Sequence, residues 1–219
     1  MNNINTILFD LDGTLIDTNE IIIRSYLYAF KKHLPEIDIS RDRVIDHIGP
    51  PLDRIFSTYT SSPFKVKAMI ETYREFYANN EFAHFKLYEG VTETLNTLHS
   101  QGYTLGIVTS KFLESARPSI EFFGLDRWMD AIITLDDVKH PKPDKEPVER
   151  ALEALDNVDT ALMVGDNTSD IESAKSAGIL SAGVAWSIKG ETVLKAANPD
   201  YMLETMDSIY AILDIDKEE

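Results

Sequence analysis

Short apolar runs rich in Ile and Val alternate along this chain with segments of helical periodicity. Each run is about five to seven residues long, as in strands that are buried on both faces of a parallel sheet. Parallel strands need crossover connections, which are right-handed and usually helical. We therefore predict an α/β fold with a Rossmann-like, doubly wound parallel sheet. The predicted strands are Ile4–Asp10, Tyr103–Thr109, Asp130–Thr134, Thr160–Gly165 and Ile179–Ala185.

Residues 17–86 interrupt this alternation and contain helix signals but no convincing strand pattern. Ser40 can cap a helix, and Pro63 is typical of the first position of another. We therefore predict that 17–86 form an all-helical domain inserted after the first strand. The Rossmann-like core would then consist of residues 1–16 and 87–219.

The chain has a formal net charge of −16 and no cysteine. A field of that sign repels nucleic acids and anionic membranes, so we expect neither as a partner. It also repels phosphate, so a phosphate site would need local cations. The absence of cysteine excludes disulfides and thiol catalysis. Because the sequence also lacks a signal-peptide pattern, we expect a cytoplasmic protein. The sequence does not distinguish a monomer from a dimer.

Two carboxylates follow the first predicted strand, in the segment Asp10–Thr14 with the sequence DLDGT. Ligands of open α/β sheets bind beyond the carboxyl ends of the strands, and a spacing of two puts Asp10 and Asp12 on one side. Two acids beside an apolar run are costly to desolvate without a metal or a partner. A solvated turn is the simpler alternative. A calcium loop of the EF-hand type is excluded, because Leu15 and Ile21 occupy its Gly and Glu positions.

Further carboxylates follow the fourth predicted strand. Asp166 follows its strand at the carboxyl end, as Asp10 follows the first strand, so a hard cation could bridge the two. Carboxylate oxygens suit Mg²⁺, which takes its remaining ligands from water and substrate. Asp170 could belong to the same site. Alternatively, Ser169 and Glu172 form a capping box, in which case Asp170 is an acid of the first helical turn.

Two more segments could bind phosphate. Thr109 and Ser110 end the second predicted strand, where a hydroxyl and backbone N–H groups can hold a phosphate, although both residues are also common helix caps. Lys142 is kept in an extended segment by Pro141 and Pro143. Its ammonium could neutralise a nucleophile and the phosphoryl oxygens. The alternative is an exposed lysine in a loop.

In this order, the segments resemble the four motifs of the haloacid dehalogenase superfamily. The similarity spans the whole chain, including a helical insert at the position of that family's type 1 cap. It implies a Mg²⁺-dependent phosphohydrolase that acts on a small phosphorylated substrate through an aspartyl-phosphate intermediate. The resemblance implies that Asp10 is the nucleophile and that Asp12 is the general acid and base. It implies that Thr109 and Lys142 bind phosphate. It also implies that Asp10, Asp166 and the Asp12 carbonyl bind magnesium, with Asp170 supporting the metal.

Two further segments, Ile48–Leu52 and Gly183–Gly190, resemble the inorganic pyrophosphatases of this superfamily and, next to them, the phosphoglycolate phosphatases. The resemblance implies hydrolysis of pyrophosphate, with phosphoglycolate or another small phosphomonoester as the alternative. Asp12 argues against the dehalogenase and phosphonatase branches, whose motif lacks a second acid. A phosphosugar mutase keeps both acids and remains open. A non-enzymatic, receiver-like phosphoacceptor fits less well, because its acceptor lies mid-chain and it needs no helical insert.

Selectivity is expected in the helical insert, because the other candidate residues recognise only a phosphoryl group. Gly49 and Pro50 could face the substrate, or simply end a helix and form a rigid turn. Arg54 and His47 lie nearby in the sequence and could meet a second anionic group. As a lone histidine, His47 would more often be a surface residue than a ligand.

Overall fold

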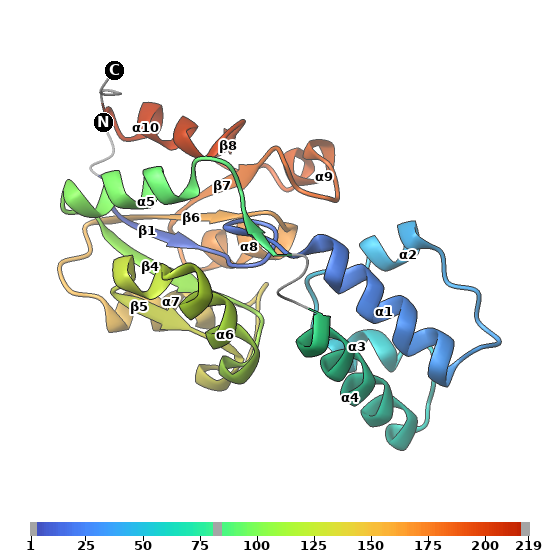
Figure 1. The fold of residues 1–219 in the computed structure, drawn as a ribbon. Coiled ribbons are helices and arrows are strands. Elements are labelled where there is room, and N and C mark those ends of the chain that lie inside the picture. Colours follow the sequence, from blue (N-terminus) through green and yellow to red (C-terminus); the bar gives the residue numbers. More distant parts are fainter. Residues whose placement is uncertain (1–3, 81–84, 216–219) are drawn as a thin grey trace. The chain divides into compact units, whose positions relative to one another are not determined.

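The computed structural model of the chain describes residues 4–80 and 85–215. The predicted domain ranges also include three segments that lie outside the described residues, namely 1–3, 81–84 and 216–219. The chain divides into two compact units (Figure 1), one of which is Asp17–Lys86, while the rest of the chain forms the other. Within the described part, no helix is both long and apolar enough to cross a bilayer.

The larger unit is built on a six-stranded sheet with the order β5-β4-β1-β6-β7-β8. All its strand pairs are parallel, which confirms the predicted doubly wound α/β fold. Within this sheet, β8 is the strand without a predicted counterpart, and two of its three residues are only partly buried at the sheet edge, so it lacks a buried apolar run. The strands are β1 (Ile4–Phe9), β4 (Thr104–Val108), β5 (Ala131–Ile133), β6 (Thr160–Gly165), β7 (Leu180–Val184) and β8 (Tyr201–Leu203).

Helices cover both faces of this sheet, so the central strands are buried on both sides. On one face, α7 and α8 pack against the strands through a core that includes Leu8, Val148 and Met163. Figure 1 shows α5 and α10 on the opposite face. In the described part of this unit, the α-helices are α5 (Val91–Ser100), α6 (Leu113–Phe123), α7 (Glu146–Ala154), α8 (Thr168–Ser176), α9 (Glu191–Ala196) and α10 (Ile209–Ile212).

The smaller unit is helical, and α1 packs along α4. An aromatic cluster of Tyr26, Phe30 and Phe56 lies in its interior, with the Phe56 ring centroid 5.5 Å from that of Tyr26 and 5.8 Å from that of Phe30. The Ser40 hydroxyl accepts a hydrogen bond from the backbone N–H of Arg43 and caps α2. The helices are α1 (Asn19–His33), α2 (Arg41–Ile45), α3 (Leu52–Phe56) and α4 (Pro63–Asn80).

Two short strands lie where the chain passes between the units. They are β2 (Ile16–Asp17) and β3 (Lys86–Leu87), which pair with each other in a separate two-stranded sheet. The sequence pattern did not predict them, because two residues cannot show alternation.

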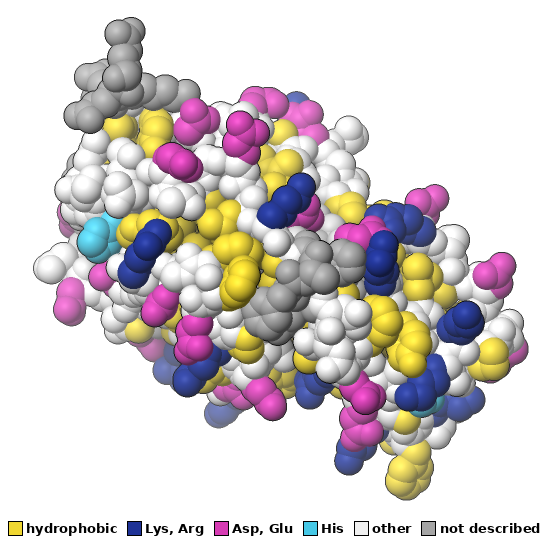
Figure 2. Space-filling model, in the orientation of Figure 1, with side chains coloured by type: hydrophobic (Ala, Val, Ile, Leu, Met, Phe, Trp, Pro, Cys, Tyr) yellow, Lys and Arg dark blue, Asp and Glu magenta, His cyan; other side chains and the backbone are white. Residues whose placement is uncertain are grey.

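On the face visible in Figure 2, acidic and basic side chains are interspersed rather than gathered into a single basic patch.

Candidate functional site

Polar residues gather at the carboxyl edge of the six-stranded sheet. Asp10 follows β1, Thr109 follows β4 and Asp166 follows β6. Because β1 pairs with β4 on one side and with β6 on the other, the three residues lie at adjacent strand ends. This is the edge at which open α/β sheets bind their ligands. The topology therefore brings together residues that are far apart in the sequence.

Three carboxylates form a buried cluster at this edge. Asp10, Asp166 and Asp170 each offer an oxygen, and these oxygens all lie within 4.8 Å of one another. The backbone packs closely around the cluster, since a Cβ on Gly165 would lie 2.3 Å from the Cβ of Asp170. Oxygen-only ligands at this spacing suit a hard divalent cation. The donor set therefore fits a metal ion.

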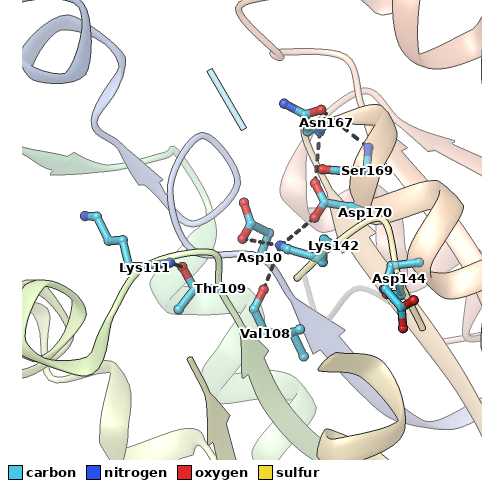
Figure 3. A network of polar contacts seen from close by, with 10 residues as sticks. Asp10, Val108, Thr109, Lys111, Lys142, Asp144, Asn167, Ser169 and Asp170 are labelled. Atoms are coloured by element: carbon cyan, nitrogen blue, oxygen red, sulfur yellow. Dashed lines mark hydrogen bonds and ion pairs between the residues drawn. The ribbon is translucent and has the colours of Figure 1, made fainter. Parts of the chain in front are cut away.

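Lys142 lies among these carboxylates and is 5% exposed. Its ammonium donates hydrogen bonds to Asp10 Oδ1 at 2.7 Å, to the Val108 carbonyl at 2.8 Å and to Asp170 Oδ1 at 2.6 Å (Figure 3). An ammonium has three protons, so these contacts use all of them. The alternative of an exposed loop lysine does not hold, because Lys142 is a fixed part of the carboxylate network.

The charges in this network perturb one another. Burial, together with the nearby Asp170 charge, raises the pKa of Asp10 to about 7 even though Lys142 opposes the shift. Burial and the charges of Asp10 and Asp170 raise the pKa of Asp166 well above its usual range. Burial lowers the pKa of Lys142, but the two carboxylates outweigh it and leave that pKa raised. The carboxylates repel one another, and a bound cation would relieve that repulsion.

Asp170 has two contacts that fix its orientation. Besides Lys142, it accepts a hydrogen bond at Oδ2 from the backbone N–H of Asn167, at 3.0 Å. Asn167 in turn caps α8 by accepting from the backbone N–H of Ser169. The predicted capping box of Ser169 and Glu172 is therefore wrong, because the helix begins earlier, at Thr168. Asp170 both completes the cap and belongs to the carboxylate cluster.

Asp12 contacts a lysine that the sequence did not single out. The Lys111 ammonium donates to Asp12 Oδ1 at 2.9 Å, and the two side chains are only 16% and 15% exposed. The backbone N–H of Lys111 donates to the Thr109 hydroxyl at 3.2 Å. Ser110 lies between these two residues and is partly buried. The available signal was the position of Lys111, in the same turn as the predicted phosphate-binding pair.

The remaining candidate residues lie in the helical unit. Gly49 has a φ of 117°, a backbone conformation that favours glycine, and Pro50 is partly buried beside it. Arg54 is exposed on α3. His47 is buried, with Nε2 2.5 Å from the Tyr59 hydroxyl. The expectation that a lone histidine would lie at the surface is wrong for His47, which is buried and contacts Tyr59.

Comparison with known proteins places the whole chain in one family. Residues 7–184 match the family described as haloacid dehalogenase-like hydrolase. A protein named pyrophosphatase PpaX from Anoxybacillus flavithermus is 46% identical over 97% of this chain and 98% of its own length. One of the same name from Bacillus velezensis is 47% identical, over 95% and 96%. The solved structure of a haloacid dehalogenase-like hydrolase from Streptococcus pneumoniae is 26% identical, covers 97% of this chain and 99% of its own, and has a TM-score of 0.84.

Proposed function

The chain belongs to the haloacid dehalogenase-like hydrolases, and from this premise we propose that it is a Mg²⁺-dependent hydrolase of inorganic pyrophosphate. The observation that carries the proposal is the setting of Asp10, a buried carboxylate at the carboxyl edge of the sheet. Asp10 accepts a hydrogen bond from Lys142 and lies beside two further carboxylates. The full-length relatives named pyrophosphatase support pyrophosphate as the substrate.

In the proposed reaction, Asp10 is the nucleophile. An Asp10 oxygen attacks one phosphorus of pyrophosphate, the bond from that phosphorus to the bridging oxygen breaks, and an aspartyl phosphate forms. Asp12 donates a proton to the bridging oxygen, so inorganic phosphate leaves. Asp12 then takes a proton from water, whose oxygen attacks the aspartyl phosphate at phosphorus. This step releases the second phosphate and restores both carboxyl groups.

The residues proposed to hold Mg²⁺ are Asp10, Asp166 and the backbone carbonyl of Asp12. When bound, the ion would offset the negative charges of the nucleophile and the phosphoryl group. Asp170 is better suited to support the site than to be a ligand, because both of its oxygens already accept hydrogen bonds, from Lys142 and from the Asn167 N–H. Its role would be to hold Lys142 beside Asp10.

Phosphate binding is assigned to Thr109, Ser110 and Lys142. The Thr109 hydroxyl accepts from the Lys111 N–H, so its own proton can turn toward a phosphoryl oxygen. Ser110 follows Thr109 at the end of β4 and adds a second hydroxyl. Lys142 donates all three of its ammonium protons within the site, so it would act on the phosphoryl group through its positive charge, which lies beside Asp10.

We assign substrate selectivity to the helical unit. Arg54 is the proposed cationic contact for the substrate, since it is exposed on α3. Gly49 and Pro50 would shape the segment that precedes this helix. The contact between His47 and Tyr59 would keep that segment in place. Arg54→Ala should raise KM for pyrophosphate, whereas Lys31→Ala, which removes an exposed charge from α1, should not.

The proposal is tested with a substrate panel of pyrophosphate, phosphoglycolate, hexose phosphates and nucleotides, assayed with MgCl₂ and compared by kcat/KM. Pyrophosphate should give the highest value, and EDTA should abolish the activity. A preference for phosphoglycolate would contradict the proposed substrate. Transfer of phosphate to a sugar instead of water would indicate a mutase, and a single stable phosphorylation per chain would indicate a receiver-like phosphoacceptor.

A further inference from the structure

The two lysines of the site contact different carboxylates. Lys142 contacts Asp10 and Asp170, whereas Lys111 contacts Asp12. Lys142 commits all three ammonium protons to Asp10, Asp170 and a backbone carbonyl, so it is fully occupied around the nucleophile. A pyrophosphate substrate also carries negative charge on its leaving phosphate. The negative net charge of the protein would repel that charge, which would also lie close to the Asp12 carboxyl. A second cation on the leaving-group side would remove this obstacle.

We propose that Lys111 is this cation and that it selects substrates whose leaving group is anionic. The inference rests on the proposed function, because it takes Asp12 as the group that protonates the leaving oxygen. The preferred leaving groups would be a phosphate or a carboxylate-bearing fragment, and an uncharged alcohol or phenol would be disfavoured.

Distances place Lys111 within reach of the leaving group. A proton donor must lie about 3 Å from the oxygen that it protonates. The Lys111 ammonium lies 2.9 Å from Asp12 Oδ1. The ammonium is therefore within about 6 Å of the leaving oxygen, and the outer oxygens of a leaving phosphate extend beyond that atom. An ammonium has three donors and can contact Asp12 and a substrate oxygen together.

The backbone holds Lys111 in this position. Its N–H donates to the Thr109 hydroxyl at 3.2 Å, and its carbonyl accepts from the Leu135 N–H at 2.9 Å. In Figure 3, Lys142 reaches Asp10 from one side, whereas Lys111 extends from the turn after β4 on the other side. The two lysines therefore serve different parts of the site.

Burial makes the Lys111 charge effective. Its side chain is 16% exposed, so water screens it less than it screens a surface lysine. Hydrogen bonds to charged groups contribute about 1.5–3 kcal/mol, which corresponds to about 10- to 150-fold in kcat/KM. Loss of the ammonium should therefore have a measurable effect that depends on the substrate.

The test compares two substrates in Lys111→Met. Pyrophosphate has an anionic leaving group, whereas 4-nitrophenyl phosphate has no charge on its leaving group before the bond breaks. We expect kcat/KM for pyrophosphate to fall at least about tenfold more than kcat/KM for 4-nitrophenyl phosphate. Lys111→Arg should keep most of the preference for pyrophosphate. Lys145→Met, which removes an exposed charge from the same unit, should not change it.

Equal losses for the two substrates would overturn the inference, because Lys111 would then only orient Asp12. An unchanged preference in Lys111→Met would overturn it as well. If Lys111→Met does not fold, the same comparison in Lys111→Gln decides the question by the same criteria. Failure of the wild-type protein to hydrolyse either substrate with MgCl₂ would instead overturn the proposed function, and the inference with it.

Discussion

Gly13 lies so close to Asp166 that a Cβ on Gly13 would be 2.3 Å from Asp166 Oδ2. The φ of Gly13 is 82°, so its backbone conformation also favours glycine. The turn after β1 therefore packs directly against a carboxylate at the end of β6. Gly13 is required for two separate reasons, and only the contact with Asp166 concerns the candidate metal site.

The first prediction separates these two reasons. Gly13→Ala should lose most activity, because the new methyl group displaces the Asp166 carboxylate, and should raise the Mg²⁺ concentration needed for half-maximal rate. Gly102→Ala is the matched control, since Gly102 has a φ of 83° and a Cβ added to it would meet no heavy atom within 4 Å. Both variants should lose about 1–2 kcal/mol of stability from backbone strain. Equal activity in the two variants would contradict the role of the contact.

The second prediction concerns the nucleophile. Asp10→Asn keeps the side chain's size but removes its charge, so kcat for pyrophosphate should fall at least about 10⁴-fold. The fold should remain, because the change also removes repulsion from Asp166 and Asp170. Phosphate release and thermal unfolding measure the two effects. Asp159→Asn, at an exposed position, should change neither. Normal turnover in Asp10→Asn would rule out the mechanism.

The parts of the fold and site that the sequence predicts are those governed by local patterns. Asp10 and Asp166 each follow an apolar run, and the ends of parallel strands meet at one edge, so the order of these runs is enough to predict their proximity. The sheet class follows from the same runs. Long buried strands such as β6 also show their bounds clearly, since Thr160–Gly165 is the range that the sequence predicts.

Features that depend on tertiary contacts were not predictable in the same way. Lys111 follows the predicted phosphate-binding pair directly, but its contact with Asp12, 99 positions earlier in the chain, is a tertiary contact that this local position does not reveal. His47 is buried and contacts Tyr59, 12 positions later, in a segment with no strong helical pattern. The start of α8 was misplaced because Asn167 and Ser169 are both good capping residues. Two hydrogen bonds distinguish them: the Asn167 side chain accepts from the Ser169 N–H, and the Asn167 N–H donates to Asp170.

The third prediction is a dependence of stability on pH in the metal-free protein. The pKa of Asp10 is about 7 in the folded protein, whereas an unperturbed Asp has a pKa of about 3.9. The folded state therefore holds the proton more tightly than the unfolded state. Stability should fall as the pH rises from about 4 to about 7. The raised pKa of Asp166 acts in the same direction.

Urea unfolding in EDTA at several pH values measures this slope. Asp10→Asn should make the slope shallower, because one of the two perturbed groups is gone. Addition of Mg²⁺ above pH 7 should raise the stability of the wild-type protein, since the cation favours the charged carboxylates. Stability that increases with pH over this range in EDTA would contradict the assignment.

The fourth prediction concerns Lys142, whose ammonium is the central donor of the buried network. Lys142→Met leaves Asp10 and Asp170 without their cation, which should cost about 3–5 kcal/mol in metal-free protein at pH 8. The loss of stability should be smaller at pH 5, because carboxyl groups can take up protons there.

The double variant Lys142→Met/Asp10→Asn tests the pair directly. Lys142→Met should cost less stability in the Asp10→Asn variant than in the wild-type protein, since one uncompensated charge is already gone. Urea unfolding measures each variant, and Lys195→Met, at an exposed position, provides the control. Strictly additive losses would show that the ion pair between Lys142 and Asp10 does not couple the two residues.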